Sequence, residues 1–395
     1  MNIERLATIV LHNGKERAVQ RFHPWVFSGA IKRIEGNPAD GDWVDVVAVD
    51  GTWLAAGHFQ EAGSISVRLL SFGKEELSDN FLLNRLRACL QVREGAGLAN
   101  NPDTNAYRLV YGEGDFLPGL VIDIYNGNAV IQCHSAGMDR MAEKWAEALL
   151  ELFGQNLHTI YKKGREKNQV VLRDEIFFKG NQEETMIMEN GCQFLVNWKS
   201  GQKTGFFLDQ RDNRNLIRNY ASGRRVLNTF CYSGGFSVYA LAAGATSVHS
   251  VDVSVKAIDW ANENIKINGF SDRVHKSFVG DSMKFMLETD SDYDLIVLDP
   301  PAFAKHLSAK HNAIQGYRRL NEVAIRNIHQ GGIIFTFSCS QVVDQQLFES
   351  TVCAAAISVG RKVRILHRLS QPADHPVSIF HPEGEYLKGL VLHIE

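Results

Sequence analysis

The stretch VLNTFCYSGGFSVYALAAGA, residues 226–245, decides the fold. Its first five residues are mostly apolar or β-branched and predict a buried strand, and an apolar, alanine-containing helix is expected over 236–243. Between them, Gly234 and Gly235 allow the backbone to turn tightly and to approach a ligand at the helix N-terminus. A strand that runs through a glycine turn into a helix is typical of a parallel α/β sheet.

The residues after 245 repeat this alternation. Ser254 is expected to cap one helix, and the pair Gly331-Gly332 is expected to end another helix and to precede a strand. Further strands are expected at 247–252, 274–278, 294–298 and 333–337, with helices at 281–288, 316–329 and 344–359, before the closing strands VRILHRL and YLKGLVLHI. The pattern predicts a doubly wound, Rossmann-like sheet whose ligand crevice lies at the carboxyl ends of its strands.

The preceding residues predict two other modules. Short strand-like pieces separated by Gly, Pro and Asp predict a small all-β barrel. A helix near 78–95 and the hairpin signal Asn126-Gly127 then favour an α+β middle domain, and Asn190-Gly191 marks a second hairpin. The predicted domains are therefore 1–72 (all-β barrel), 73–185 (α+β) and 186–395 (the doubly wound sheet).

Composition excludes several protein classes. Of the 395 residues, 45% are hydrophobic and 22% are charged, as in ordinary globular proteins. No run of about twenty apolar residues predicts a membrane span, and the first residues do not resemble a secretory signal. The six cysteines are scattered without metal-ligand spacing, which favours a reducing cytoplasm and predicts no metal site.

Charge is distributed unevenly along the chain. The net charge of −3 gives no argument for a polyanionic partner. Residues 199–225, however, hold seven bases and two acids, and residues 302–320 hold four bases, two histidines and no acid. These segments indicate either a localised binding face or solvated helix surfaces, and the sequence leaves both interpretations open.

Each expected strand of the C-terminal sheet is followed by a polar group. The first leads into the glycine turn, and the next strands are followed by Asp252, Asp281, Asp299-Pro300-Pro301 and Cys339. A single acid at a strand end is also a common helix cap, so the ordered set carries the argument. The glycine turn is neither a GxGxxG motif nor a phosphate loop, which disfavours a dehydrogenase or a nucleoside triphosphatase.

These motifs resemble those of a known family. The stretch at 226–245 and HSVDVS, VGDSMKFM, YDLIVLDPPAFAK and IIFTFSCS look like successive motifs of a class I S-adenosylmethionine-dependent methyltransferase. Together with SGQKTGFFLDQRDNR (200–214) and QPADHPVSIFHPEGEYLKGL (371–390), nearly the whole chain resembles the bacterial 5-methylcytosine methyltransferases of large-subunit (23S) ribosomal RNA. The N-terminal barrel resembles an RNA-binding PUA domain, most clearly at NGKERAVQRFHPWVFSGAI (13–31).

The resemblance implies roles for particular residues. Cys339 would be a nucleophile that adds to carbon 6 of cytosine, with Asp299 as the acid that holds the base. Cys231 is interpreted as packing beneath the cofactor, and the other four cysteines as structural. S-adenosylmethionine would be bound by Gln210, Asn228, Thr229, Tyr232, Ser233, Gly234, Asp252, Asp281 and Asp299, and the substrate base by Pro300, Pro301, Phe303 and Lys305.

The resemblance also implies a cytoplasmic enzyme that acts on 23S ribosomal RNA, without a membrane, and forms a homodimer. One departure keeps an alternative open, because Ala302 follows Asp299-Pro300-Pro301 where the better-known RNA 5-methylcytosine enzymes have a second cysteine. Asp-Pro-Pro also resembles enzymes that methylate a guanine or adenine nitrogen, which need no covalent nucleophile. A non-catalytic RNA-binding assembly factor is a further alternative, and in either case Cys339 would be an inert core thiol.

Overall fold

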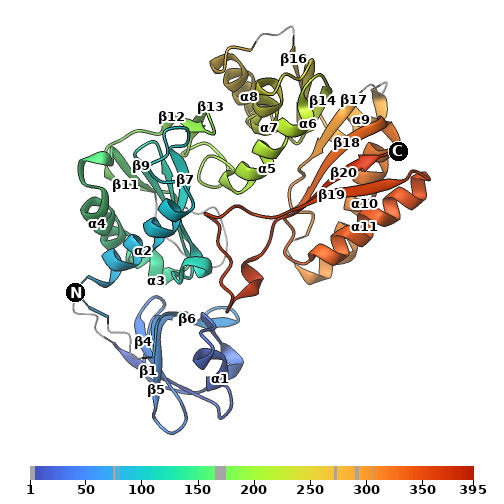
Figure 1. Cartoon of the computed structure of the whole chain (residues 1–395). Helices are drawn as coiled ribbons and strands as arrows, with labels where there is room; N and C mark the ends of the chain where they lie inside the picture. Colours follow the sequence, from blue (N-terminus) through green and yellow to red (C-terminus); the bar gives the residue numbers. More distant parts are fainter. Residues whose placement is uncertain are drawn as a thin grey trace. The chain divides into compact units, whose positions relative to one another are not determined.

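The computed structural model describes residues 5–73, 77–78, 80–164, 175–270, 274–289, 293–304 and 306–395. The chain forms two compact units, and each unit takes segments from distant parts of the sequence (Figure 1). Unit 1 comprises Met1–Thr185, Val196–Phe206 and Ala373–Gly384, and unit 2 comprises Met186–Leu195, Phe207–Pro372 and Glu385–Glu395. The domain boundaries after residues 72 and 185 stay predictions.

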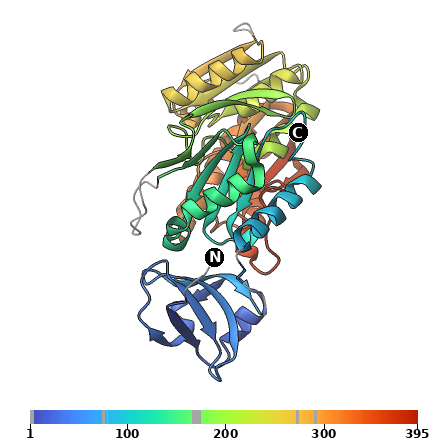
Figure 2. The ribbon, with the colours of Figure 1, turned by 90° about the vertical axis from the view of Figure 1, so that its left-hand side faces the viewer.

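The N-terminal part of unit 1 is a six-stranded sheet of order β2-β6-β5-β4-β1-β3. Figure 2 shows how these strands curve around one another. Ile9, Val46 and Leu69 are fully buried and belong to one apolar cluster. The small all-β barrel predicted from the sequence is therefore confirmed. Its elements are β1 (Ala7–Leu11), α1 (Glu16–Gln20), β2 (Trp25–Phe27), β3 (Ile31–Gly36), β4 (Trp43–Val47), β5 (Trp53–Phe59) and β6 (Ile65–Phe72).

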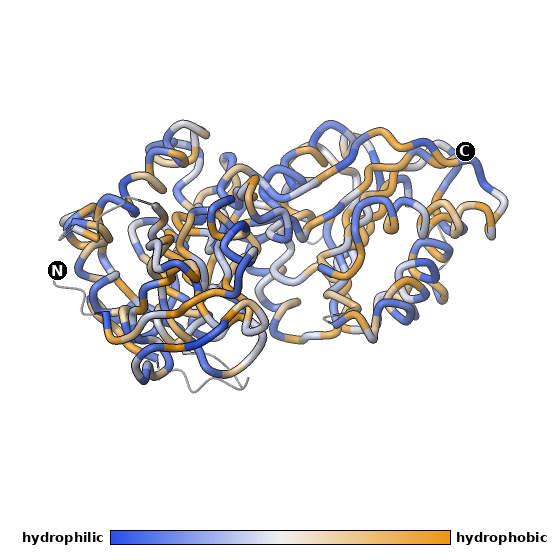
Figure 3. The backbone as a smooth tube through the Cα atoms, turned by 90° about the horizontal axis from the view of Figure 1, so that it is seen from below, coloured by the Kyte–Doolittle hydropathy of each residue, from blue (hydrophilic) through white to orange (hydrophobic). Residues whose placement is uncertain are grey.

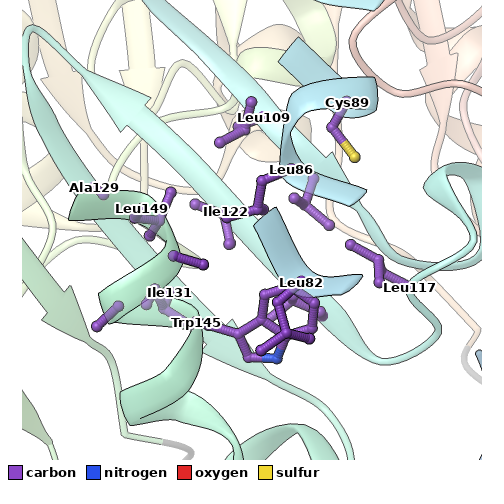
Figure 4. Close-up of a cluster of buried hydrophobic side chains, with 14 of the residues drawn as sticks. Leu82, Leu86, Cys89, Leu109, Leu117, Ile122, Ala129, Ile131, Trp145 and Leu149 are labelled. Atoms are coloured by element: carbon purple, nitrogen blue, oxygen red, sulfur yellow. The ribbon is translucent and has the colours of Figure 1, made fainter. Parts of the chain in front are cut away.

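The middle of the chain builds a five-stranded sheet of order β11-β10-β9-β8-β7 covered by helices. Figure 4 shows Leu86 of α2 and Trp145 and Leu149 of α4 against the sheet residues Ile122 and Ile131, in one buried cluster. The elements are α2 (Phe81–Gly95), β7 (Ala106–Tyr111), β8 (Leu120–Tyr125), β9 (Asn128–Cys133), α3 (Ala136–Arg140), α4 (Ala142–Phe153), β10 (Thr159–Lys162) and β11 (Ile176–Lys179).

Both predicted Asn-Gly hairpins are present. Asn126 and Gly127 join β8 to β9 with φ angles of 46° and 72°, and Asn190 and Gly191 join β12 (Glu184–Glu189) to β13 (Cys192–Asn197) with φ angles of 49° and 77°. Positive φ at both central residues suits the right-handed twist of the paired strands, and Asn and Gly adopt it at low cost.

Unit 2 contains the predicted doubly wound sheet, with seven strands in the order β16-β15-β14-β17-β18-β20-β19. The first five strands of this order are parallel to one another, whereas β20 runs antiparallel to both β18 and β19. The strands are β14 (Arg225–Thr229), β15 (Ser247–Asp252), β16 (His275–Val279), β17 (Tyr293–Leu298), β18 (Ile328–Ser338), β19 (Val363–Leu369) and β20 (Lys388–Ile394).

Helices cover both faces of this sheet. They are α5 (Arg211–Leu216), α6 (Arg218–Ala221), α7 (Gly235–Ala242), α8 (Val255–Ile267), α9 (Ser282–Glu288), α10 (Lys310–Asn327) and α11 (Gln345–Val359). Ile334 of β18 joins the apolar cluster with α10 and α11, while its neighbours Phe335 and Phe337 contact Tyr220 of α6 and Phe236 of α7 on the opposite face. Residues 333–337 of β18 are all buried, as expected of a strand that is covered on both faces. Figure 3 shows hydrophobic (orange) stretches of the tube in the part of the chain that ends at the C-terminus.

The prediction that Gly331-Gly332 precede a strand is wrong. Gly331 and Gly332 lie inside β18, which begins directly after α10 ends at Asn327. Gly331 has a φ of 77° near a register shift in the β17–β18 pairing, so it marks an irregularity in the strand and not a break before it.

Gly316 lies inside α10, where a Cβ would come within 2.9 Å of the Phe303 ring, so close packing explains this glycine.

No helix within the described part of the chain combines the length and the apolar character that a membrane crossing requires.

Replacing Leu149 with alanine is expected to lower the free energy of unfolding by about 2–5 kcal/mol, because the lost methyl groups leave a cavity in the middle-domain core. Leu149 is fully buried, whereas Val92 on α2 is 48% exposed. The control Val92→Ala should change the free energy by about 0.5 kcal/mol or less. Urea denaturation measures both values, and equal losses would contradict this core.

Candidate active site

The glycine turn after β14 has a strained backbone. Phe230 and Tyr232 have positive φ angles of 53° and 47°, which side chains other than glycine rarely adopt. Gly234 has a φ of 77°, and a Cβ there would lie 3.0 Å from the Cβ of Ala261 in α8. The glycine therefore allows α7 and α8 to approach closely while the turn keeps its shape.

Polar residues at the end of β14 form hydrogen bonds that stabilise this turn. The Asn228 side chain donates to Ser237 Oγ at 2.9 Å, and Thr229 Oγ1 donates to the Val297 carbonyl of β17 at 2.6 Å. Both side chains are buried, as is Ser233. Asn228 and Thr229 thus form hydrogen bonds within the protein, to α7 and to β17. These bonds stabilise the glycine turn.

Asp252, at the end of β15, binds the same turn. Its carboxylate accepts hydrogen bonds from the backbone amides of Tyr232 and Ser254, both at 2.9 Å. Asp252 is half-buried, and each carboxylate oxygen can accept a further bond. Asp281, after β16, is exposed and caps α9 by accepting from the Lys284 amide at 2.8 Å. Asp281 therefore has the capping role that the sequence had left open, whereas the N-cap of α8 is Ser254 and Asp252 binds the turn instead. The carboxylate oxygens of both acids can accept further hydrogen bonds.

Aromatic rings surround Tyr232. Its ring makes edge contacts with Phe207 at 5.0 Å and with Trp260 of α8 at 5.7 Å between centroids. The Lys256 ammonium lies 5.0 Å from the centre of the Trp260 ring. Sequence reasoning missed Phe207 and Trp260, because their positions give no signal until α8 and the segment before α5 are folded against the turn.

Asp299 lies directly after β17 and is held by Gln210. The Gln210 amide donates to Asp299 Oδ1 at 3.0 Å, and its carbonyl oxygen accepts from Asn213 at 2.7 Å. Gln210 is buried and Asp299 is half-buried. The structure thus joins two residues that are 89 positions apart and that the sequence analysis had assigned to the same site.

Cys339 lies directly after β18, on the strand next to β17. Its side chain is half-buried, and its Sγ is 3.9 Å from the carbonyl oxygen of Pro300. Since β17 and β18 are parallel neighbours, Asp299-Pro300 and Cys339 meet at one edge of the sheet. The thiol is therefore neither a core filler nor a fully exposed surface group.

The residues predicted to hold a substrate base continue from Asp299. Pro300 is buried, Pro301 is exposed, and Phe303 is 36% exposed with its ring 4.6 Å from that of Tyr317. Lys305 lies outside the described residues. The Phe303 ring therefore packs against Tyr317 and remains partly accessible to solvent.

Sequence reasoning missed Lys388, the first residue of β20. It pairs with Ser338 across the β18–β20 ladder, it is 3% exposed, and its ammonium donates to the carbonyl oxygens of Ser340 and Tyr386 at 2.8 and 2.6 Å. A signal was present, because a lone lysine begins the apolar strand KGLVLHI. Buried lysines are uncommon and are often functional.

The basic segment 199–225 is in part internal. Arg214 binds Glu189 through two contacts of 2.8 and 2.7 Å, and Arg211 lies 3.7 Å from the same carboxylate, with all three side chains buried. An arginine in a buried ion pair does not contact a polyanion. Neither of the two interpretations left open by the sequence, a binding face or a solvated helix surface, therefore holds for Arg211 and Arg214.

The other cysteines differ in exposure. Cys231 is buried against Ile258 and Ala261, and its burial raises the pKa of the thiol. Cys353 is exposed on α11. This exposure does not support the structural role that was expected of it. In the described part of the chain, no cluster of three His, Cys, Asp or Glu side chains forms a potential metal site.

Family comparisons agree with this arrangement. A family described as S-adenosylmethionine-dependent methyltransferase matches residues 161–382, and one described as a PUA-like domain matches residues 9–72. Ribosomal RNA large subunit methyltransferase I of Aeromonas hydrophila subsp. hydrophila is 40% identical, covering 98% of this chain and 99% of the relative. The protein of the same name from Alteromonas mediterranea is 37% identical with the same coverage.

Solved structures show the same fold. A putative SAM-dependent methyltransferase from Streptococcus mutans has a TM-score of 0.83 and 22% identity, covering 98% of this chain and 99% of that chain. A putative methyltransferase complexed with SAH has a TM-score of 0.84 with the same identity and coverage. The predicted combination of an N-terminal PUA-like domain with a methyltransferase fold is therefore confirmed.

Replacing Glu189 with glutamine is expected to destabilise the protein by about 3–5 kcal/mol, because Arg211 and Arg214 would lose a buried counter-charge. Glu184 on the same strand is exposed, so Glu184→Gln is a matched control that should have little effect. Chemical denaturation of both variants tests the assignment. Similar unfolding curves for the two would show that the buried pair does not stabilise unit 2.

Proposed function

Because the chain belongs to the S-adenosylmethionine-dependent methyltransferase family, we propose that it forms 5-methylcytosine in large-subunit ribosomal RNA through a covalent adduct of Cys339. The named relatives support the class of RNA. The meeting of Cys339 with Asp299-Pro300 at the edge between β17 and β18 supports the chemistry. In this proposal residues 1–72 bind RNA and residues 186–395 carry the reaction.

The residues around the glycine turn fit the cofactor of this family. Asp252 is half-buried with acceptor capacity for ribose hydroxyls, and the exposed Val253 beside it offers apolar surface. Asp281, on the neighbouring strand end, is exposed. Tyr232 and Gly234 would lie against the ligand, with Asn228, Thr229 and Ser233 supporting the turn. S-adenosylmethionine supplies an electrophilic methyl group when it is bound.

Cytosine carbon 5 is a weak nucleophile and needs activation. In the proposed reaction the Cys339 thiolate forms a bond to carbon 6, and the electrons of the carbon 5–carbon 6 double bond make carbon 5 nucleophilic. Once the methyl group is bonded to carbon 5, a base or water takes the carbon 5 proton, the carbon 5–carbon 6 double bond forms again and the carbon 6–sulfur bond breaks to release the thiolate. A cysteine suits this role because the same group must add and later leave.

Asp299 would hold the base while this charge develops. A carboxyl group beside the ring can hydrogen-bond nitrogen 3 and the exocyclic amino group, where electron density rises on thiolate addition. Gln210 donates to one oxygen of Asp299 and so restricts the orientation of the carboxyl group. Gln210 is then a positioning residue for Asp299 in addition to the cofactor-binding role that the resemblance implies.

Phe303 would receive the extruded base. A base must leave its stack to reach a reactive thiol, and an aromatic face compensates for part of the lost stacking. The Phe303 ring packs on Tyr317, and Gly316 leaves the space that it occupies. This support favours Phe303 as a fixed platform, with the exposed Pro301 beside it.

RNA that contains 5-fluorocytosine tests the proposed chemistry. Fluorine cannot leave as a proton does, so incubation with S-adenosylmethionine should trap a protein–RNA adduct that survives a denaturing gel. The adduct should disappear in Cys339→Ala and persist in Cys353→Ala, which removes the exposed thiol of α11.

Other outcomes point to the alternatives. Methylation of ordinary RNA without an adduct, retained in Cys339→Ser, would indicate a base nitrogen as the target. Cofactor binding without methylation of any RNA would indicate a non-catalytic assembly factor. Either result contradicts a Cys339 adduct.

Replacing Asp252 with asparagine should weaken S-adenosylmethionine binding about 10- to 100-fold, since hydrogen bonds to a charged acceptor contribute about 1.5–3 kcal/mol. Asp259→Asn on α8 is the control, because Asp259 is exposed and belongs to the helix and not to the strand end. Titration calorimetry on the folded proteins gives both affinities. Unchanged affinity in Asp252→Asn would remove Asp252 from the cofactor site.

A further inference from the structure

Lys388 occupies an unusual environment beside the candidate nucleophile. Its ammonium is buried and donates to the Ser340 and Tyr386 carbonyl oxygens. Ser340 directly follows Cys339, and Lys388 pairs with Ser338 on the other side of it. The backbone contact on one side of Cys339 and the strand pairing on the other therefore hold the ammonium against the chain segment that carries the thiol, and the two groups interact electrostatically.

The structure does not pair this ammonium with a carboxylate. Among the described residues, Lys388 forms no ion pair, although a buried ammonium is costly without an anionic partner. Two carbonyl dipoles compensate for only part of the lost hydration. A thiolate at Cys339 would supply the missing negative charge.

The charged groups around the pair favour this assignment. Burial lowers the pKa of Lys388 to about 8, and Cys339 is the strongest of the acidic groups that oppose the fall, ahead of Glu385 and Asp344. A pKa of about 8 favours the protonated form of Lys388 at neutral pH. On the other sides of Cys339 are Tyr317 of α10, whose pKa is raised by burial, and Asp299 at the end of β17.

The carboxyl group of Asp299 disfavours a thiolate at Cys339 unless a cation lies nearby. A carboxylate near a thiol disfavours the thiolate, because two negative charges then share one site. Tyr317 stays neutral and donates or accepts through its hydroxyl contact with Ser340 Oγ at 2.9 Å. Cys339 Sγ also contacts the Pro300 carbonyl oxygen at 3.9 Å, which is a long and therefore weak hydrogen bond.

We propose that the Lys388 ammonium stabilises Cys339 as a thiolate at neutral pH, so that Lys388 is a positioning residue for the nucleophile. The proton of Cys339 passes to solvent, and Lys388 stays protonated throughout. Catalytic use of the thiolate rests on the proposed function, but the charge state of Cys339 does not. The two can therefore be tested separately.

Alkylation of the full-length protein by iodoacetamide, without RNA or cofactor, measures this charge state. Mass spectrometry of the digested protein follows Cys339 and Cys353 in the same sample as a function of pH. Cys339 should reach half-maximal reactivity about one pH unit or more below the exposed Cys353, because an adjacent cation favours the thiolate. A midpoint for Cys339 at or above that of Cys353 overturns the proposal without any variant.

Two variants test the assignment to Lys388. In Lys388→Met the Cys339 midpoint should rise by about one pH unit and its rate at pH 7 should fall about tenfold, with Cys353 unchanged. Lys388→Arg keeps the charge and should restore the lower midpoint. An unaltered Cys339 profile in Lys388→Met overturns the proposal.

The result is independent of the adduct experiment. A low Cys339 midpoint together with no 5-fluorocytosine adduct would refute the proposed reaction and leave the ion pair established. An adduct together with a Cys339 profile that does not respond to Lys388 would refute only the ion pair.

Discussion

The parallel pairing of β17 with β18 is the constraint on which the candidate site depends. Leu298 lies opposite Thr336, so both strands end at the same edge and bring Asp299 and Cys339 together. A shift of one residue would exchange the two faces of β18 and move Phe335 and Phe337 into the α10–α11 cluster. Burial on both faces therefore fixes the register, and the register fixes the position of the thiol.

A second layer of buried polar contacts holds the groups that meet at this edge. Glu189 binds Arg214, Arg214 donates to the Phe207 carbonyl at 2.8 Å, and the segment from Phe207 places Gln210 against Asp299. Because Glu189, Arg214 and Gln210 are buried, removal of one partner leaves another unsatisfied, which makes the arrangement sensitive to single changes. Core packing thus supports the strands, and buried ion pairs support the side chains of the site.

The sequence predicts this fold well where local chemistry determines structure. Alternating strands and helices, the Asn126-Gly127 hairpin and the Ser254 cap depend on neighbouring residues and were found as expected. Gly331 was misread, because it lies near a register shift inside β18, and the packing of Gly316 against Phe303 could not be foreseen. Lys388 and Arg214 depend on partners 48 or 25 residues away, and no local pattern identifies such contacts.

Two thiols near strand ends of one sheet, Cys231 and Cys339, lie in different environments. Cys231 is enclosed by Ile258 and Ala261, where burial raises the pKa of the thiol and Asp252 raises it further. Cys339 is half-buried and lies beside the Lys388 ammonium, which favours the opposite charge state. Position at the carboxyl end of a strand brings either thiol near a ligand, but solvent access and an adjacent cation distinguish them. These differences in solvent access and charge are the reason that the proposed function assigns the nucleophile to Cys339 and not to Cys231.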